Sequence, residues 1–413
     1  MSSALEKTIQ NIKKIVDVSE LNNYNFDKTK IWITSHHTES NTLLTIPHEA
    51  TFYWLRVKQY VREKSFRTKI RLSDEFISNQ IHNLILEVKT DQKKYEDISR
   101  TVKNWVDDLS KLSVSNFLIV LPINNVDYRS DLDLGPVKMV KLTQSLLESN
   151  IEFKSKVGHF SSKEIFKDLV TTNETEIFFI IEVQAKDQEQ AKELAKLYLK
   201  KFVYVMRLFS PNSGITDRDY YYPGTHTWVI LYNKDKKSLS TNGTNLHLNA
   251  HITPPKQYWQ RIQPDWNQLT SFLYSNNHTE LQSVILTGLY WYGDAGYDKK
   301  NENRPSIFLK YMMGLESMLI FDRKHDKKIR IADRFGKIYS KIHSNYDFYY
   351  ELMKNYYELR NDAVHAGKVI IENEVIVTTH DWLRNLLFYY IRNSKKYSDI
   401  KTMFDKEYSI KLT

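Results

Sequence analysis

Apolar positions recur every three or four residues through most of the last third of the chain. Because this period places one apolar stripe along an α-helix, each segment that carries it is predicted to be an amphipathic helix. The segments are residues 278–292, 304–322, 328–343, 346–366 and 379–395. With short connections between them, they predict a helical bundle over residues 266–413.

The first part of the chain mixes shorter apolar runs with helical spacing. The runs at 117–122, 176–183 and 228–232 have strand composition and end at Pro or polar turn residues, so each predicts a strand. The second run is followed by a long segment with helical spacing, residues 187–209, which predicts an amphipathic helix. We therefore expect a mixed α/β region over residues 1–265, with a division into two subdomains near residue 150 as one option, and an α+β fold class for the whole chain.

Local signals mark the limits of several predicted helices. Pro305 stands at the start of its helix, where the missing amide hydrogen costs nothing. Thr378 followed by Asp381 resembles a capping box. Only residues 368–377 interrupt the helical pattern, and their β-branched side chains predict a small hairpin.

Composition adds a strong positive charge to this picture. The formal net charge is +9 and the pI is about 9.1, which favours association with RNA, DNA or acidic membranes without selecting among them. The chain has no cysteine, which excludes disulfides, thiolate catalysis and thiolate zinc sites. With neither a signal-peptide pattern nor a membrane-spanning run, the chain is expected to be cytoplasmic and to have no membrane partner.

The helix at 346–366 ends in the segment YELRNDAVHAG, which places an arginine five residues before a histidine. This spacing alone arises by chance in roughly every second chain of such composition, so its surroundings matter. The apolar residues of this helix share one predicted face: Tyr349, Met353, Tyr356 and Leu359. The polar edge then presents Arg360, Asn361 and His365, three groups that can surround one phosphate.

A purely structural role is the competing interpretation. Arg360 and His365 can each pair with a carboxylate such as Glu316 and so fix the packing of the helices. Glu316, in the segment MGLESML, is then expected to hold Arg360 or a backbone amide. The sequence has no HExxH motif, carboxylate cluster or Gly-rich phosphate loop, which disfavours a metal nuclease, a protease and a P-loop ATPase. No metal or other cofactor is expected.

Two basic segments are candidates for contact with nucleic acid. Residues 58–71 interleave cations with Tyr60 and Phe66, as a single-strand groove does, although a solvated surface is the commoner meaning of such a pattern. The second segment, residues 324–334, lies in the bundle and is the preferred candidate for guiding RNA. Its cations are Lys324, Lys327, Lys328, Arg330 and Arg334.

Taken together, the C-terminal features resemble the HEPN family, and more narrowly its Apea-like group. Residues 360–365 match the family's Arg-polar-x3-His motif. The aromatic helix LTGLYWYGDAGYD, the Gly-Leu-Glu segment at 314–316 and the basic helix KIRIADRFGKIYS agree with it, and the resemblance covers about residues 266–400. Asn361 stands where the group often has Ser, and Ala366 stands where Gly often follows the histidine directly.

This resemblance implies a metal-independent endoribonuclease that acts as a dimer. His365 would perform general acid/base catalysis, Arg360 would bind the phosphate and stabilise the transition state, and Asn361 would form hydrogen bonds that orient the histidine or the phosphate. Asp362 and Glu316 would have supporting roles. One motif supplies a single histidine, so two motifs across a two-fold axis would supply both base and acid and leave 2′,3′-cyclic phosphate and 5′-hydroxyl ends.

The family also implies a biological setting. The protein would be an antiviral effector of abortive infection that cleaves tRNA or other cellular RNA after a phage-derived trigger reaches residues 1–265. A homodimer or higher oligomer would form through the bundle. Two alternatives stay open: a non-catalytic RNA-binding or dimerisation scaffold, and the toxin of a toxin–antitoxin pair.

Overall fold

The computed structural model describes most of the chain. The described ranges are 3–22, 31–37, 42–65, 72–123, 131–151, 162–173, 175–209, 216–219, 227–244, 246–249, 256–298, 303–320, 326–366 and 370–408. Helices predominate in them, and a six-stranded antiparallel sheet lies in the first part of the chain. The predicted α+β class is confirmed.

The N-terminal unit is a small helical body with its own core. It contains the helices α1 (Ser3–Val18), α2 (Thr51–Ser65), α3 (Asp74–Thr90), α4 (Gln92–Glu96) and α5 (Ile98–Lys111). A three-stranded sheet in the order β1 (Glu20–Asn22), β3 (Thr42–Pro47), β2 (Ile31–His37) joins them, and η2 (His48–Ala50) leads into α2. The core runs from Ile9 to Leu109. This core therefore closes near residue 112, earlier in the chain than the suggested division near residue 150.

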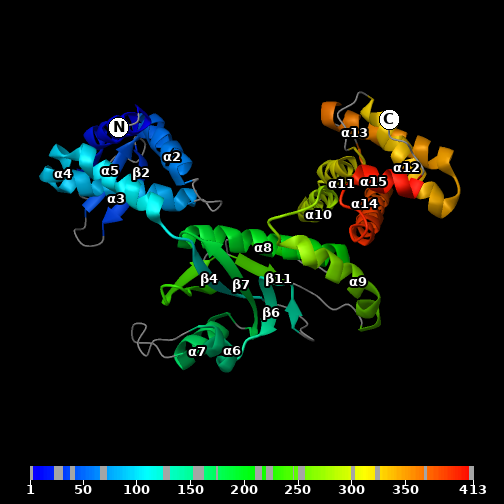
Figure 1. Ribbon diagram of the computed structural model, residues 1–413, viewed down its shortest axis with the longest axis horizontal. Coiled ribbons are helices and arrows are strands. Elements are labelled where there is room, and N and C mark those ends of the chain that lie inside the picture. Colours follow the sequence, from blue (N-terminus) through cyan, green and yellow to red (C-terminus); the bar gives the residue numbers. More distant parts are fainter. Residues whose placement is uncertain are drawn as a thin grey trace.

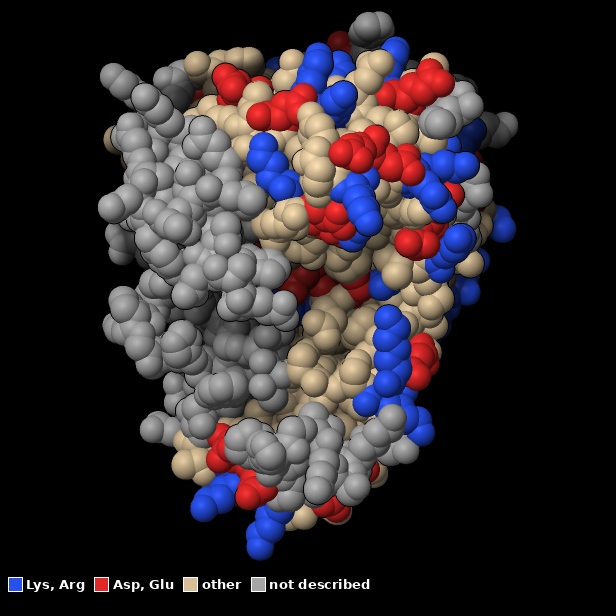
Figure 2. Space-filling view, turned by 90° about the vertical axis from the view of Figure 1, so that its left-hand side faces the viewer, with Lys and Arg blue, Asp and Glu red and all other residues tan. Residues whose placement is uncertain are grey.

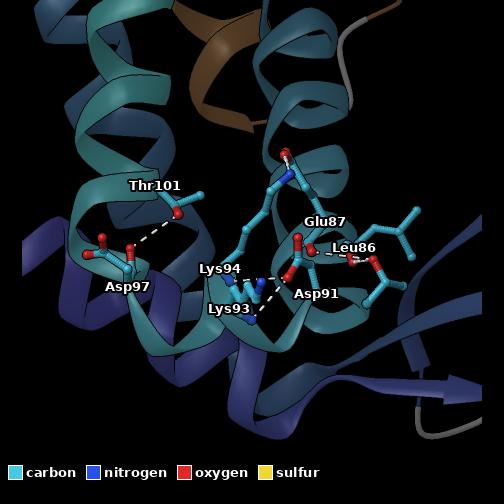
Figure 3. A network of polar contacts seen from close by, with 8 residues as sticks. Leu86, Glu87, Asp91, Lys93, Lys94, Asp97 and Thr101 are labelled. Carbon is cyan, nitrogen blue, oxygen red and sulfur yellow. Dashed lines mark hydrogen bonds and ion pairs between the residues drawn. The ribbon is translucent and has the colours of Figure 1, made fainter.

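Polar caps fix the turns of this unit, as Figure 3 shows for the junction of α3 with α4. The Asp91 carboxylate accepts hydrogen bonds from the backbone N–H groups of Lys93 at 3.0 Å and Lys94 at 3.4 Å. Those donors belong to the first turn of α4, which has no intrahelical partners for them. The Lys94 side chain also pairs with Glu87 on α3, so the two helices are joined at this corner.

The central sheet has the strand order β10-β9-β4-β7-β6-β5. The strands are β10 (Ser238–Thr244), β9 (Thr227–Asn233), β4 (Ser115–Pro122), β7 (Ile177–Ala185), β6 (Val137–Lys141) and β5 (Leu132–Asp133). The strands predicted at 117–122, 176–183 and 228–232 are thereby confirmed as β4, β7 and β9. A separate two-stranded pair joins β8 (Thr216–Asp219) to β11 (Leu246–Asn249).

Both faces of the central sheet are covered, because its strands alternate apolar side chains to the two sides. The long helix α8 (Gln188–Phe209) lies on one face, and α6 (Gln144–Asn150) and α7 (Ser162–Asn173) lie on the other (Figure 1). In the same view the N-terminal unit and the C-terminal bundle stand toward the two ends of α8. This helix is thus the element that connects the three parts.

At its first turn, α8 is tied to the N-terminal unit. The buried Asp187 carboxylate accepts hydrogen bonds from the Ser73 hydroxyl at 2.8 Å and the Ser73 backbone N–H at 3.1 Å. The same carboxylate caps α8 by accepting from the Gln190 N–H, and Ser73 caps α3. Two helix starts therefore satisfy their amides through one linked pair of side chains.

Toward its other end, α8 packs closely on the bundle. An added Cβ at Gly293, on α10, would overlap the ring of Tyr204 on α8, so only glycine permits this approach. Arg207 then donates a hydrogen bond to the Gly293 carbonyl at 2.5 Å. One continuous core runs from the sheet through α8 into the bundle, so these two parts share buried apolar surface.

The bundle contains α9 (Lys256–Leu273), α10 (Glu280–Asp298), α11 (Arg304–Leu319), α12 (Lys327–His343), α13 (Tyr346–Ala366), α14 (Asn373–Asn393) and α15 (Ile400–Tyr408). The five predicted helices are confirmed as α10 to α14. Pro305 lies in the first turn of α11, where Asn303 caps the helix through the Ser306 N–H at 3.2 Å. The first helix, α9, crosses the predicted boundary at residue 265.

Two local predictions are wrong at the start of α14. Its helix begins at Asn373, so the second half of the predicted hairpin at 368–377 is helical, and Thr378 lies inside the helix and does not cap it. The reason is burial, since Ile376 and Thr379 face the core. The Thr379 hydroxyl also donates a hydrogen bond to the Val375 carbonyl at 2.8 Å. Packing of this face outweighs the weak preference of β-branched residues for strands.

Candidate functional site

The helix α13 carries the predicted motif at the edge of the bundle. Its predicted apolar face is confirmed, because Met353 is fully buried and the other members pack partly buried against the same core: Tyr349, Tyr356 and Leu359. This contact fixes the rotation of α13 about its axis. Arg360 and Asn361 are consequently half-buried on the neighbouring edge, while His365 is exposed.

Arg360 is held by a carboxylate from the preceding part of the bundle. Its Nη2 lies 3.3 Å from Oε2 of Glu316 on α11, and its Nη1 donates to Oδ1 of Asn361 at 3.1 Å. The guanidinium also lies 5.6 Å from the centroid of the Tyr357 ring. The side chains of Arg360 and Glu316 are only 23% and 18% exposed, so their pairing is stronger than that of a surface ion pair.

Glu316 also links Arg360 to the basic helix α12. Its Oε1 lies 3.5 Å from Nζ of Lys327, whose side chain is 59% exposed. Burial, and then the negative charge of Glu316, raises the pKa of the nearby Tyr357 phenol, which therefore stays protonated at neutral pH. The expectation that Glu316 holds Arg360 is confirmed.

His365 has a different environment from Arg360. It lies one residue before the end of α13, with an exposed side chain. Within the described part of the chain, its imidazole makes no hydrogen bond or ion pair, and the same holds for the exposed carboxylate of Asp362. The structural alternative, in which both motif residues fix helix packing, therefore describes Arg360 but not His365.

The predicted basic segment divides into exposed and buried members. Lys324 lies outside the described residues. Lys328 donates to Glu358 on α13 at 2.6 Å, a hydrogen bond that raises the pKa of its ammonium, and Arg330 is half-buried. Lys327 and Lys328 thus lie beside carboxylates of α11 and α13 near the start of the motif.

Arg334 requires a correction. It is 2% exposed, and its Nη1 donates to the Leu319 carbonyl at 2.5 Å at the C-terminal end of α11. A guanidinium in this position satisfies an orphan carbonyl of a helix end and cannot reach RNA. The expected RNA contact by Arg334 is therefore wrong, because helical periodicity turns this position toward the core.

The N-terminal basic segment offers no uniform cationic surface in its described part. Residues 66–71 lie outside the described residues, and Lys58 and Arg62 both pair with Asp74 at the start of α3. Figure 2, which views the molecule from the side of the N-terminal unit, shows Lys and Arg interspersed with Asp and Glu over the upper part of that face. Such a mixture is typical of a solvated surface.

One polar chain in the bundle has no signal in the sequence. The Tyr292 hydroxyl lies 2.7 Å from Nε2 of His380, and Nδ1 of His380 lies 2.9 Å from a carboxylate oxygen of Asp381. The His380 side chain is 15% exposed. The tyrosine partner of His380 is 88 residues away in the chain, and no motif connects the two.

Two other kinds of site, a metal centre and a membrane span, are absent from the described ranges. In those ranges, no group of three or more His, Asp or Glu is placed to hold a metal ion. None of the described helices is long and apolar enough to cross a membrane. Comparisons with protein-family models, with curated proteins and with solved structures found no match.

Proposed function

We propose that the C-terminal bundle is a metal-independent endoribonuclease of the HEPN type. The observation that carries this proposal is the arrangement of Arg360, whose guanidinium is held by Glu316 next to Asn361, one helical turn before an exposed His365. A guanidinium has five N–H donors, and the contacts with Glu316 and Asn361 use two of them. The remaining Nη donors are suited to a phosphate.

The chemistry follows from the groups that this edge provides. A histidine acting as base removes the proton from a ribose 2′-hydroxyl, whose oxygen forms a bond to the adjacent phosphorus. The bond from phosphorus to the 5′-oxygen breaks, and a protonated histidine supplies the proton that this oxygen takes up. Arg360 stabilises the added negative charge on the phosphorane. The products are a 2′,3′-cyclic phosphate and a 5′-hydroxyl.

A dimer supports this mechanism because one chain offers a single motif histidine. Exposure of His365 at the end of α13 permits the motif of a second copy to approach it. In a two-fold arrangement the partner's His365 acts as the acid while the first acts as the base. Such a site is incomplete in one chain.

The biological role extends from the same proposal. The enzyme acts in the cytoplasm on tRNA or other cellular RNA and limits phage growth by harming its host. Such an activity needs restraint, and the region before the bundle is large enough to supply it. The core that α8 shares with the bundle supports a coupling between the two.

A non-catalytic RNA-binding scaffold is the second candidate. The observation that favours it is the Arg360–Glu316 pair, since this contact also stabilises the packing of α11 against α13. A scaffold has no requirement for His365. The two candidates therefore differ in what His365 does.

The test is RNA cleavage by the purified full chain in EDTA. Wild type, Arg360→Ala and His365→Ala are incubated with total RNA and with tRNA, and the ends of the products are mapped. General acid/base catalysis contributes about 100- to 10,000-fold, so we expect His365→Ala to lose at least about 100-fold in rate with unchanged RNA affinity. His48→Ala is the matched control, because His48 is also exposed and lies in the N-terminal unit.

Equal cleavage by wild type and His365→Ala contradicts the nuclease proposal. RNA binding without cleavage by any variant, together with unchanged host survival during phage infection, identifies the scaffold. Loss of viability on expression of the wild type alone, relieved by a separately encoded protein, identifies a toxin–antitoxin pair.

A further inference from the structure

Strand β7 has no partner along the last part of its side that faces β6. The pairing of β6 with β7 ends at Val137 opposite Ile181, followed by a hydrogen bond from the Glu182 N–H to the Pro136 carbonyl at 2.8 Å. The chain turns back there, since the Leu134 N–H donates to the Val137 carbonyl at 2.9 Å. Strand β7 continues to Ala185, so its last residues extend beyond β6.

The register shows which way the last backbone groups of β7 point. Gln184 lies opposite Asn116 of β4, and the Asn116 carbonyl accepts from the Lys234 N–H at 2.8 Å, on the side away from β7. In an antiparallel ladder the N–H and C=O of one residue point to the same side. Those of Gln184 therefore point away from β4, toward the line that β6 has left. No strand in the described ranges continues that line.

A groove of about 1210 Å³ runs along this edge. On the sheet side it is lined by Pro136, Glu182 and Gln184, and on the helical side by Tyr198 of α8 and by Thr270 and Tyr274 at the end of α9. The two tyrosine rings lie 4.9 Å apart, and the Tyr274 hydroxyl donates to the Tyr198 carbonyl at 3.1 Å. These contacts hold the two tyrosines together as one wall of the groove, the tyrosine wall.

The charges of the groove disfavour nucleic acid and nucleotides. Its lining has two carboxylates, Asp133 and Glu182, and one ammonium, Lys234, which lies 3.0 Å from Glu182. Binding a polyanion requires an excess of cations. The other polar groups are amides and hydroxyls, which donate to and accept from an uncharged backbone. They include Asn116, Gln184, Asn267, Thr270, Ser271, Ser275 and Asn276.

We propose that this groove binds an extended polypeptide segment that adds to the edge of β7 at Gln184 and continues the line of β6. The main chain of the segment pairs with the Gln184 N–H and C=O, and its side chains lie against the tyrosine wall. An exposed strand edge is normally blocked by charge, Pro or a covering element, and here it lies against a groove. Because α9 belongs to the bundle, the bound segment contacts both the sheet and the bundle.

Peptide binding here goes beyond the proposed ribonuclease and does not depend on it. Random linear 12-residue peptides displayed on filamentous phage are panned against the full-length protein. The most enriched peptide is synthesised with a fluorescein label, and its Kd is measured by fluorescence anisotropy. An ATP analogue and a 12-nucleotide RNA, both labelled, serve as the polyanion probes.

Two substitutions at one position separate main-chain pairing from side-chain contact. Gln184→Pro removes the N–H that points into the groove and leaves the pairing with β4 intact, as Pro is tolerated at a strand edge. We expect the Kd to rise about 10-fold, the effect of one or two lost hydrogen bonds. Gln184→Thr keeps the N–H and should bind as wild type. Ser271→Trp, on the exposed side of α9, should block the groove without touching the core.

Three outcomes overturn the proposal. The first is a library that yields no enriched peptide. The second is a peptide whose Kd is unchanged by both Gln184→Pro and Ser271→Trp, with the fold of each variant verified by circular dichroism. The third is binding of the RNA or the ATP analogue that Ser271→Trp abolishes. If Gln184→Pro does not fold, Ser271→Trp alone decides, and an unchanged Kd then contradicts the proposal.

Discussion

At the residue scale, the two residues of the motif differ more than their spacing indicates. Arg360 is half-buried and held by Glu316, whereas His365 is exposed at the end of the same helix. A fixed guanidinium is preorganised to meet charge that develops on a phosphate, and an exposed imidazole is accessible to both substrate and solvent. In the proposed enzyme, Glu316 would support catalysis by positioning Arg360.

Removal of the Glu316 charge tests this positioning. In Glu316→Gln the half-buried guanidinium of Arg360 loses its anionic partner, and we expect the free energy of unfolding to fall by about 1 kcal/mol, measured by urea denaturation. RNA cleavage should fall as well, because Arg360 is then less well placed. The matched control is Glu358→Gln, which removes the exposed pair with Lys328 and should change little. Equal losses in the two variants would show that the Arg360–Glu316 pair behaves as a surface contact.

A second residue-scale prediction concerns His82 in the N-terminal unit. Its ring lies 4.7 Å from the Trp54 ring, and burial lowers the pKa of its imidazole to about 4. The unfolded chain binds this proton below its ordinary pKa of about 6.5, so the neutral ring stabilises the fold above that pH. The contribution is lost as the pH falls from about 6.5 toward 4.

The measurement compares wild type with His82→Phe, which keeps an aromatic ring beside Trp54 but does not titrate. Urea midpoints are determined at pH 7 and pH 5. Wild type should lose more stability than His82→Phe over this interval. An identical loss in both proteins would assign the pH dependence to other groups.

At the scale of elements, the contacts of helices depend on where glycine permits a close approach. On α10, Gly288 lies against the side chain of Met318, and Gly293 lies against the ring of Tyr204. A methionine can move to another rotamer, whereas the tyrosine ring is buried between α8 and α10. An added methyl group should therefore be tolerated better at Gly288 than at Gly293, although both lie on α10.

Alanine substitutions at these glycines make a matched pair. Gly293→Ala should reduce the free energy of unfolding by about 1–3 kcal/mol, because the added methyl group forces α8 away from α10. Gly288→Ala should be milder, since Met318 can yield and alanine favours the helix by up to about 1 kcal/mol. Chemical denaturation of both variants provides the measurement. A larger loss in Gly288→Ala would contradict this account of the α8–α10 contact.

At the scale of the whole molecule, one core unites the sheet, α8 and the bundle, while the N-terminal unit has a core of its own. The N-terminal unit meets α8 through the buried pair of Ser73 with Asp187. In the proposed enzyme, a signal received by the N-terminal unit would pass through this polar pair and then through the packing of α8 against α10. The proposed enzyme requires one further level of assembly, the dimer.

Mixing experiments test that assembly. With a threefold excess of His365→Ala over wild type after subunit exchange, wild-type dimers fall to about one sixteenth of all dimers. If both histidines are required, the RNA cleavage rate per wild-type chain should fall to about a quarter. The control is the same excess of His48→Ala, which should not reduce the rate. An unchanged rate with His365→Ala would indicate that each chain acts alone.

The sequence by itself determined the helical bundle, three strands of the central sheet, the long helix after β7 and the apolar face of α13. These features depend on local periodicity, which burial on one side of an element produces directly. The bundle limit was less well predicted, because α9 carries Pro264 and begins before the expected boundary. Periodicity also failed at 373–377, where burial of Ile376 made a β-branched run helical.

Only the tertiary structure decided which cations are exposed and which carboxylates hold them. Arg334 and Lys327 stand in one basic segment and on nearly the same side of α12, yet Arg334 is buried and Lys327 is exposed. Lys327 is the first residue of the helix, whereas Arg334 lies about two turns further along, against the C-terminal end of α11. The tertiary structure alone likewise decides the Arg360–Glu316 pair, the contact of Tyr292 with His380, and the groove beside β7. Each joins residues from separate elements, and their distances depend on how those elements pack, which no local pattern encodes.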